Sequence, residues 1–262
     1  MAAELAPSAR RAAELGVDLR FYGEVERLMP LAYELALREP RTAHGRVLLA
    51  ERVRGARGRH GRTWVAERGG LWLALSLYDD HLPQTRGLFS LLFGVALGAL
   101  AREIGLPAHV RWINDLHHRG RKIAGVLIEK RGDWLVVGIG VNVNNPPPHH
   151  LPAESLARLA GAPLSLEDLT NALLGKLRYY YGLLRELESS LAPGEDLPEN
   201  PLVRDFLELS DTPGRCVAWA RDLDRDQPLL GRAEGVLPDG SLLLRTGGDL
   251  LTLETGEIIY LY

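Results

Sequence analysis

Cysteine is nearly absent from this chain: Cys216 is the one cysteine among 262 residues. A single thiol cannot close a disulfide within the chain, which is typical of a protein kept in a reducing compartment. No apolar run reaches the roughly 18 residues that a membrane-spanning helix needs. The opening segment, MAAELAPSARRAAELGVD, carries acidic residues early and lacks the apolar centre of a signal peptide. We therefore expect a cytoplasmic protein without a membrane partner.

An excess of positive charge is absent as well. The chain has 31 Lys and Arg residues against 34 Asp and Glu residues, a formal net charge of −3. General nucleic-acid binders show a basic balance or a basic face, so we expect no nucleic-acid partner. Hydrophobic residues make up 46% and charged residues 25% of the sequence, the usual mixture of a globular protein with a sizeable core. The length indicates one large domain, or one domain with a smaller one attached.

The hydrophobic pattern divides the chain into three segments. Residues 1–20 predict a short polar helix, an N-terminal extension with too few residues for a helix-turn-helix DNA-binding domain. Residues 21–209 mix apolar strands with helices, which indicates an α+β domain built on a mixed sheet. From residue 210 to residue 262 short strands alternate with turns, which indicates a separate small domain.

Periodicity places the elements of the larger segment. Apolar residues recur at helical spacing in 24–39, and a mostly apolar helix in 88–104 must pack on a sheet. Arg131-Gly132-Asp133 separates two apolar strands as a hairpin turn. The predicted helices are 24–39, 88–104 and 166–187, and the predicted strands are 46–53, 69–77, 109–113, 122–130 and 134–143.

The C-terminal segment predicts a small all-β barrel. Its short strands are separated by turns, and Asp239-Gly240 is a strong hairpin signal. Five such strands over about 50 residues are enough to close a small barrel.

A glycine- and arginine-rich segment, Gly55-Ala-Arg-Gly-Arg-His-Gly-Arg-Thr-Trp64, predicts an anion-binding loop. Glycines allow backbone N–H groups to approach a phosphate closely, and arginine forks bind phosphate or carboxylate with two hydrogen bonds. We expect such a loop to be mobile alone and ordered by an anion. A solvated surface loop with no ligand is the alternative.

Asp115 and Lys122 stand seven residues apart in Arg111-Trp-Ile-Asn-Asp-Leu-His-His-Arg-Gly-Arg-Lys-Ile. The end of a strand is a common place for ligand contacts, and a tight connection could return Lys122 to the side of Asp115. A lysine there can neutralise a carboxylate oxygen and a phosphate oxygen as they react. The alternative is an exposed hairpin with a surface aspartate and lysine.

Four motifs in this order resemble those of the biotin protein ligases, over roughly residues 20–262. The glycine/arginine loop resembles their adenylate-binding loop, and Arg111-Trp-Ile-Asn-Asp-Leu resembles their Lys-Trp-Pro-Asn-Asp-Leu motif. Gly120-Arg-Lys-Ile-Ala-Gly-Val-Leu-Ile-Glu and Val137-Gly-Ile-Gly-Val-Asn-Val-Asn resemble two further motifs of that family. The resemblance implies a biotin/lipoate ligase-like catalytic domain over 21–209 and an SH3-like barrel over 210–262.

The resemblance also implies a reaction: ATP and a biotin carboxylate give biotinyl-5′-AMP, which a lysine of a biotin carboxyl carrier protein domain then attacks. ATP and Mg²⁺ are the implied cofactors. Lys122 is implied at the junction of carboxylate and phosphate, and Asp115 in positioning nucleotide and metal. The implied substrate- and adenylate-binding residues are Arg57, Gly58, Arg59, Arg62, Trp64, Trp112, Asn114, Gly125 and Asn142.

The acid-binding side departs from the family pattern. The family usually has Ser-Thr-Asn at the start of its first helix, where this chain has Arg27, Leu28 and Met29. A Gln-Thr or Gln-Gln pair before the loop is replaced by Val53-Arg54. Within the motifs, Ala56 replaces a glycine and His60 an arginine of the loop, while Ile113 replaces the proline of Trp-Pro-Asn-Asp. The lost polar groups normally bind the ureido ring of biotin.

Three hypotheses stay open from the sequence. The first is a biotin–carrier-protein ligase with a divergent acid pocket. The second is a related ligase that adenylates another carboxylic acid, such as a lipoyl or acyl chain. The third is a non-catalytic homologue that binds a nucleotide or a partner. We expect no protein-held metal site at His117-His118 or at His149-His150, and a homodimer formed through the sheets is plausible for such a family member.

Overall fold

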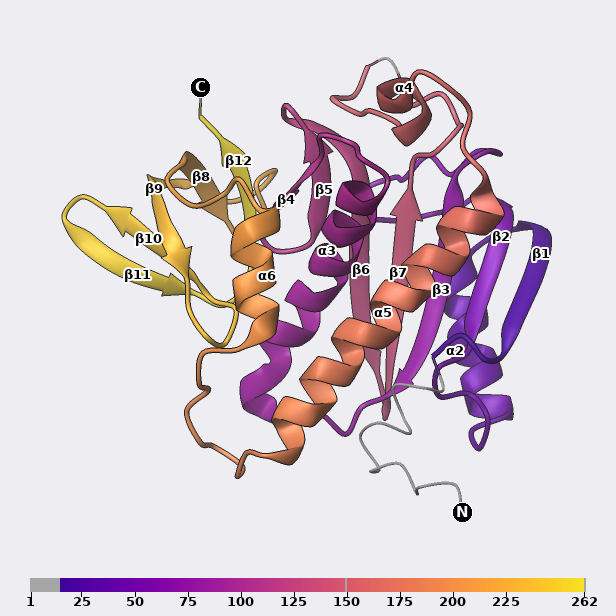
Figure 1. Ribbon diagram of the computed structural model, residues 1–262, viewed down its shortest axis with the longest axis horizontal. Coiled ribbons are helices and arrows are strands. Elements are labelled where there is room, and N and C mark those ends of the chain that lie inside the picture. Colours follow the sequence, from indigo (N-terminus) through magenta and orange to yellow (C-terminus); the bar gives the residue numbers. More distant parts are fainter. Residues whose placement is uncertain (1–14, 149, 262) are drawn as a thin grey trace.

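The computed structural model describes residues 15–148 and 150–261, in which a seven-stranded sheet forms the centre (Figure 1). Its β1 and β2 run parallel, and all other neighbouring strands are antiparallel, so the sheet is mixed as the sequence predicts. In spatial order the strands are β1 (Leu19–Val25), β2 (Val47–Val53), β3 (Leu71–Tyr78), β7 (Trp134–Val141), β6 (Arg121–Arg131), β5 (Asp115–His118) and β4 (His109–Arg111).

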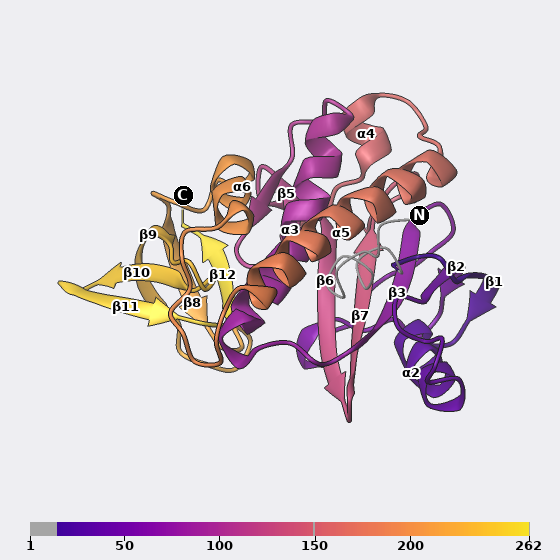
Figure 2. The ribbon, with the colours of Figure 1, turned by 60° about the horizontal axis from the view of Figure 1, so that its bottom comes forward.

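Helices cover both faces of this sheet. Figures 1 and 2 show α3 (Arg86–Glu103) and α5 (Leu166–Ser189) on one face, and α2 (Leu28–Arg38) on the other. Two shorter helices are α4 (Leu156–Ala160) and α6 (Pro201–Leu209). In the chain they follow β7 and precede the C-terminal strands. Because side chains alternate along each strand, the two faces of the sheet contribute to different apolar clusters, a large one with α3 and α5 and a smaller one with α2.

Helix α3 is the core helix of the larger cluster. By length and composition the helical span Pro83–Glu103 could cross a membrane, with a mean hydropathy of 1.3 over an 18-residue window, but 78% of that window is buried within the protein. The helix packs against α5, α6 and strands β4 to β6. Its apolar residues on every side are thus explained by burial on every side, as expected for a helix enclosed by other elements.

The C-terminal barrel comprises five antiparallel strands. In spatial order they are β11 (Asp249–Leu253), β10 (Leu242–Thr246), β9 (Leu229–Val236), β8 (Cys216–Ala220) and β12 (Glu257–Tyr260). The turn at Asp239-Gly240 precedes β10 as predicted, and Gly240 has the positive φ of 88° that favours glycine. This turn contacts α3, because the carbonyl oxygen of Asp239 lies beside Gly87. Cys216, the single cysteine, is exposed.

Most strands and long helices predicted from the sequence are confirmed. The predicted helix in 24–39 begins only at Leu28, because the residues before it form β1, a strand that the sequence pattern missed. β1 is an edge strand whose seven residues are half-buried or exposed without strict alternation, so it lacks the period of two that marks a half-buried strand. The predicted helix in 1–20 lies mainly outside the described residues, and its last two positions belong to β1. Helix α6 was not predicted.

The contact between α3 and the barrel turn makes a stability prediction. A Cβ atom on Gly87 would lie 2.2 Å from the carbonyl oxygen of Asp239, so Gly87→Ala forces the turn away from the helix. We expect a loss of about 1–3 kcal/mol in the free energy of unfolding, the usual cost of overpacking, measured by urea denaturation. Gly175→Ala is the matched control in α5, since nothing lies within 4 Å of the added Cβ. Equal stability of the two variants would contradict the contact.

Candidate functional site

A cavity of about 380 Å³ opens between the two sheets on the α2 side, within the size range of sites for small ligands. Four parts of the chain form its walls: the start of α2, the loop of residues 55–64, the segment 111–115 and the barrel. Strands β6 and β7 form its floor. The residues that line it include Arg27, Leu28, Met29, Val53, Ala56, Arg57, Gly58, Arg59, Arg62, Trp64, Trp72, Trp112, Asn114, Asp115, Lys122, Gly125, Gly138, Gly140, Gly256 and Glu257.

Glycines on the floor leave the space that the cavity occupies. Gly125 of β6 pairs directly with Gly140 of β7, and Gly138 lies two residues further along the same face. A Cβ on Gly125 would lie 2.8 Å from Nζ of Lys122, and one on Gly140 would lie 2.9 Å from the ring nitrogen of Trp64. Side chains at these positions would therefore displace the groups that line the site.

A cluster of two cations and one carboxylate lies at the floor. Nζ of Lys122 is 2.7 Å from Oδ1 of Asp115, and Nη2 of Arg111 is 3.1 Å from Oδ2. Burial alone would raise the pKa of Asp115, but the charges and hydrogen bonds of Lys122 and Arg111 lower it to about 2. Asp115 is therefore ionised at neutral pH, and the cluster keeps one net positive charge. Nζ of Lys122 also lies 5.5 Å from the centroid of the Trp64 ring, within cation–π range.

The connection between β5 and β6 brings Asp115 and Lys122 together, as the sequence predicted. Arg119 and Gly120 form a two-residue turn in which both φ angles are positive, 49° and 77°, the geometry of a tight hairpin. The pairing register shifts between Leu116 and His117. This extra residue in β6 lets Lys122 and Gly125 both face the cavity, because a bulge interrupts the alternation of side chains.

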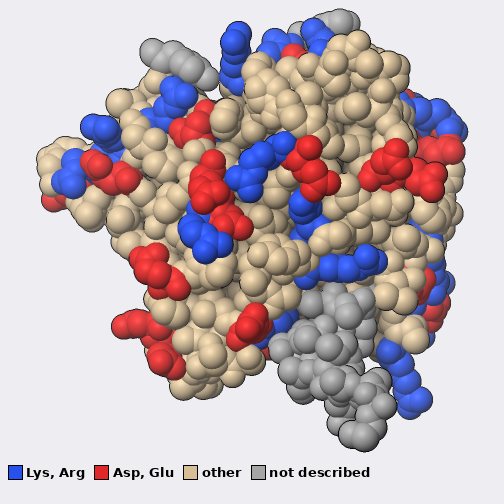
Figure 3. All heavy atoms as spheres, viewed as in Figure 1, with Lys and Arg blue, Asp and Glu red and all other residues tan. Residues whose placement is uncertain are grey.

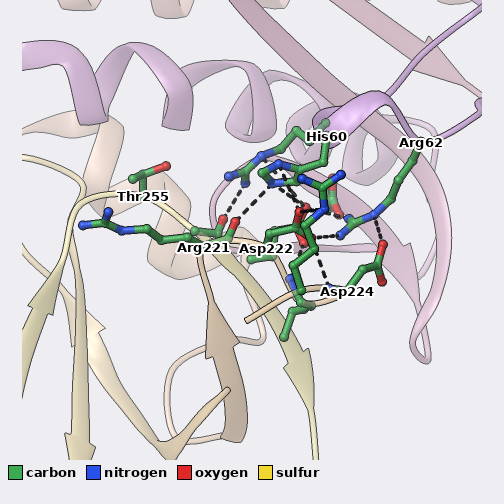
Figure 4. Close-up of polar contacts among 12 residues, drawn as sticks. His60, Arg62, Arg221, Asp222, Asp224 and Thr255 are labelled. Atoms are coloured by element: carbon green, nitrogen blue, oxygen red, sulfur yellow. Dashed lines mark hydrogen bonds and ion pairs between the residues drawn. The ribbon is translucent and has the colours of Figure 1, made fainter. Parts of the chain in front are cut away.

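The loop of residues 55–64 lies against the barrel, and Arg62 makes the densest contacts (Figure 4). Its guanidinium group contacts three carboxylates of the barrel: Asp222 at 2.9 Å, Asp224 at 2.5 Å and Glu257 at 2.7 Å. Asp222 and Glu257 are only 9% and 13% exposed, so these two pairs are shielded from solvent. The charge of Arg62 is thus balanced by the barrel.

The other polar side chains of the loop have different partners. Arg59 donates to the carbonyl oxygen of Gly256 over 2.6 Å, and Arg57 donates within the loop to Gly61 and Thr63. His60, at a left-handed φ of 55°, lies 3.1 Å from the carbonyl oxygen of Arg221 (Figure 4). The sequence predicted a loop ordered by an anion, whereas here the carboxylates and carbonyls of the barrel order it.

One end of the cavity, called the acid end because the sequence predicted that the carboxylic acid binds there, is mainly apolar. Leu28 and Val53 are each 6% exposed, and the sulfur of Met29 lies over Gly138 on the floor. Arg27 is exposed at the rim and forms no ion pair with any described residue. The ring N–H of Trp64 is buried and has no hydrogen-bond partner among the described residues. A bound molecule would meet few polar side chains here.

The cavity brings together every residue of the predicted site except one. Asn142 is 4% exposed and does not line the cavity, because its side-chain oxygen accepts a hydrogen bond from Asn145 over 3.0 Å. Its backbone instead links β7 to β6 and to the start of α4. Trp112 is 2% exposed, and the peptide bond that follows it is cis.

Residues of the barrel were not among the predicted ligands, although Gly256 and Glu257 line the cavity together with Leu223, Ile258 and Ile259. They lie far along the chain from the four motifs on which the sequence prediction rested. Arg111 was read only as a retained basic residue, and the structure assigns it the second contact to Asp115. Contacts of this kind join residues far apart in the chain.

Comparison with known proteins agrees with this arrangement. The model of the biotin/lipoate A/B protein ligase family matches residues 22–144. A biotin–[acetyl-CoA-carboxylase] ligase of Mycobacterium tuberculosis is 33% identical over 224 residues, covering 83% of this chain and 79% of that protein. The bifunctional ligase/repressor BirA of Escherichia coli is 28% identical over 222 residues, covering 82% of this chain and 66% of that protein.

Solved structures give the same fold. The biotin protein ligase from Aquifex aeolicus, in complex with biotin and ATP, has a TM-score of 0.76 and 22% identity, covering 93% of this chain and 98% of that one. The central mixed sheet and the C-terminal strands therefore share their arrangement with that solved structure. The chain belongs to the biotin/lipoate A/B protein ligase family and, within it, to the biotin ligases.

The lowered pKa of Asp115 makes a prediction about stability and pH. Because the folded-state pKa lies below the ordinary value of 3.8, the carboxylate stabilises the fold above about pH 4, by about 2 kcal/mol, and this contribution is lost as the pH falls toward 2. We expect the difference in free energy of unfolding between the wild type and Asp115→Asn to shrink by about 1 kcal/mol between pH 6 and pH 3. Urea denaturation measures it.

The control for this experiment is Asp133→Asn, which removes an exposed turn carboxylate that forms no ion pair with any described residue. The difference in free energy of unfolding between Asp133→Asn and the wild type should stay nearly constant over the same pH range. A constant difference for Asp115→Asn as well would show that Lys122 and Arg111 do not hold this carboxylate in its ionised form.

Proposed function

We propose that the protein is an ATP-dependent biotin–carrier-protein ligase, which forms biotinyl-5′-AMP and transfers biotin to a lysine of a carrier domain. One observation carries the proposal: the net positive cluster of Lys122, Asp115 and Arg111 lies on a glycine floor, beside a loop with three arginines. The name of the mycobacterial relative supports the choice of biotin and of a carboxylase carrier.

The geometry suits the first half of the reaction, in which two anions must meet. A carboxylate oxygen attacks the α-phosphorus of ATP, the bond to the β-phosphate oxygen breaks, and pyrophosphate leaves. Fixed cations in a partly enclosed site offset the repulsion without reorganising during the reaction. Lys122, which projects from the floor 5.5 Å from the Trp64 ring centroid, is placed to contact both anions. In the second half the carrier amine attacks the acyl carbon and AMP leaves.

Asp115 acts in this proposal by holding cations, not by moving protons. With a pKa of about 2 it is a poor base at neutral pH. Its two oxygens engage Lys122 and Arg111 separately, so it fixes the position of both charges. Removing the carboxylate would leave these cations repelling each other within the site.

ATP and Mg²⁺ are the proposed cofactors. Asp115 is paired with Lys122 and Arg111, and Glu257 is paired with Arg62, so cations of the protein already engage these two carboxylates. This fits Mg²⁺, which is commonly held through substrate phosphates and one or two carboxylates. The ion would screen the phosphate charge while the protein positions the acid.

The carrier lysine must reach the acyl group from outside the cavity. The loop of residues 55–64 and the barrel both line the cavity, so we propose that a carrier domain binds next to them. Figure 3 shows the face of the molecule covered by α3 and α5, where positive and negative side chains are mixed and no large area carries one sign. A homodimer stays a proposal, for which the exposed edge strand β1, with Phe21 74% exposed, offers a pairing edge.

A second candidate function is favoured by the apolar acid end. Leu28, Met29 and Val53 offer no side-chain hydrogen bond to a ureido ring, and an unpaired buried polar group costs roughly 1–3 kcal/mol. These residues suit the chain of a lipoyl or acyl acid equally well. A purely non-catalytic role is not favoured, since the Lys122–Asp115 pair is assembled and faces the cavity.

Calorimetric titration with biotin and then with a nonhydrolysable biotinyl-5′-AMP analogue decides between the acids. Tight binding of both supports the biotin ligase. Binding of ATP without binding of biotin or the analogue would overturn it, and pyrophosphate exchange with lipoic and octanoic acids would then test the second candidate. Exchange with none of the acids would overturn both.

Lys122→Ala tests the activating cation. We expect acid-dependent pyrophosphate exchange to fall by about 10²–10³-fold, the usual cost of losing one fixed electrostatic contact. Lys130→Ala is the matched control, because Lys130 lies on the same strand but is exposed and paired with Asp79 outside the cavity. An unchanged rate in a folded Lys122→Ala variant would remove this residue from the mechanism.

Arg62→Ala tests whether the loop retains the adenylate. Without its guanidinium, Asp222, Asp224 and Glu257 repel one another and no longer hold the loop. We expect the adenylate to dissociate about 10-fold faster or more, since charged hydrogen bonds contribute roughly 1.5–3 kcal/mol each, measured by stopped-flow displacement. Arg68→Ala, which removes an exposed arginine outside the cavity, should leave the rate unchanged. An unchanged rate for Arg62→Ala would show that the loop is not a lid.

A further inference from the structure

A buried chain of hydrogen bonds joins the C-terminal barrel to the hairpin that carries Asp115, and the chemistry proposed above does not use it. His117 of β5 is 1% exposed, and its Nε2 lies 2.9 Å from Oδ1 of Asp211, in the segment that leads into the barrel. Tyr260 of β12 donates its hydroxyl hydrogen to the same oxygen over 2.6 Å. A strand of the central sheet and a strand of the barrel therefore meet at one carboxylate.

The partners of His117 fix the direction of this chain. The backbone N–H of Gly120 donates to Nδ1 of His117 over 3.1 Å, so Nδ1 must carry a lone pair and Nε2 the hydrogen. Nε2–H then donates to Asp211. Burial alone would raise the pKa of Asp211, but the hydrogen bonds from His117 and Tyr260 lower it to about 2, so it accepts from both as an anion.

A second branch reaches the wall of the cavity. The backbone N–H of Trp112 donates to Oγ1 of Thr212 over 3.0 Å, and Oγ1 lies 2.9 Å from the hydroxyl of Tyr260. Because Tyr260 gives its own hydrogen to Asp211, the Thr212 hydroxyl donates to Tyr260. The ring N–H of Trp112 also donates to the carbonyl oxygen of Gly240, in the barrel turn. Trp112 is thus held at its backbone and at its ring.

The two branches enclose the reactive part of the hairpin. Asp115 lies between Trp112 and His117, which are the two points anchored by the barrel. Gly120, which donates to His117, lies in the turn that returns the chain to Lys122. A shift of either anchor would change the 2.7 Å contact between Asp115 and Lys122, and displacements near 1 Å can reduce reaction rates about 10²-fold.

We propose that His117, Asp211 and Tyr260 are positioning residues for adenylate formation, through which the barrel sets the place of Asp115 and Lys122. The inference rests on the proposed function, since it concerns the same site. A partly buried carboxylate such as Asp211, 21% exposed, adds little net stability compared with apolar packing, but its polar partners require one geometry. That requirement suits a group whose role is to fix orientation rather than to hold the domains together.

The test compares three variants by steady-state pyrophosphate exchange, with KM and kcat measured separately. Tyr260→Phe removes one hydroxyl from the chain, and we expect kcat to fall about 10- to 100-fold while KM for ATP changes less than threefold. Asp211→Asn keeps an acceptor oxygen and should lose less activity than Asp211→Leu. Tyr179→Phe, which alters an exposed tyrosine on α5, is the matched control and should behave as the wild type.

A double variant separates positioning from independent damage. His117→Gln and Tyr260→Phe interrupt the same chain of hydrogen bonds. The kcat of the double variant should therefore lie within about twofold of the kcat of the less active single variant. Multiplying losses would mean that the two residues act separately. A wild-type kcat in folded Tyr260→Phe and Asp211→Leu would overturn the proposal.

Amide hydrogen exchange keeps the two proposals distinguishable. In Tyr260→Phe we expect faster exchange at Trp112 and Gly120, with no change in α5. If the wild type forms no adenylate from any acid tested, the proposed function fails, and the positioning chain is then judged on exchange alone. Faster exchange confined to the hairpin would support the chain, and unchanged exchange there would overturn it.

Discussion

The antiparallel pairing of β6 with β7 is the constraint on which the site depends. Its register fixes which residues face α3 and α5 and which face the cavity. Val126 pairs with Ile139 on the core side, while Gly125 pairs with Gly140 on the other. The core side must be filled because it supplies the apolar burial that stabilises the fold, and the cavity side must stay empty of side chains. A shift of one residue would exchange the two faces, so stability and function depend on the same register.

Near the site, charge and hydrogen bonds join the barrel to the loop of residues 55–64. Arg62 places one guanidinium among three carboxylates, two of which are mostly shielded from solvent. Single exposed ion pairs contribute little, whereas a network around one planar guanidinium fixes geometry. The loop that carries Arg57 and Arg59 is therefore held down by an arginine that is itself neutralised. This leaves the net positive cluster at Lys122 as the charge nearest the floor.

The sequence was sufficient for the local parts of this arrangement and insufficient for the long-range parts. Strands β2, β3, β6 and β7 carry apolar runs bounded by turn residues, and the Arg119-Gly120 turn allows the predicted meeting of Asp115 and Lys122. Edge strand β1 was missed because its residues do not alternate between apolar and polar with the period of two that marks a half-buried strand. The partners of Arg62 lie about 160 to 195 residues away in the chain, and no local pattern encodes such a contact. Asn142 shows the converse: its motif predicts a ligand contact, but its amide bonds Asn145.

The cavity has two halves. The half around Lys122 and Asp115 keeps the residues of the family motifs, whereas the half around Leu28, Met29 and Val53 departs from them. The two halves select a substrate acid through different interactions. A site that hydrogen-bonds a polar ring can reject analogues by about 10⁴-fold, whereas an apolar pocket separates related chains by only about 10- to 200-fold. Leu28, Met29 and Val53 place the acid end in the second class. In the reaction proposed above, Lys122 contacts only the phosphate and the carboxylate of the substrates, so the half around Lys122 would act on any carboxylate that reaches it. Selectivity must then come from the shape of the apolar end, from the buried N–H of Trp64, and from whichever carrier domain fits the mouth of the cavity.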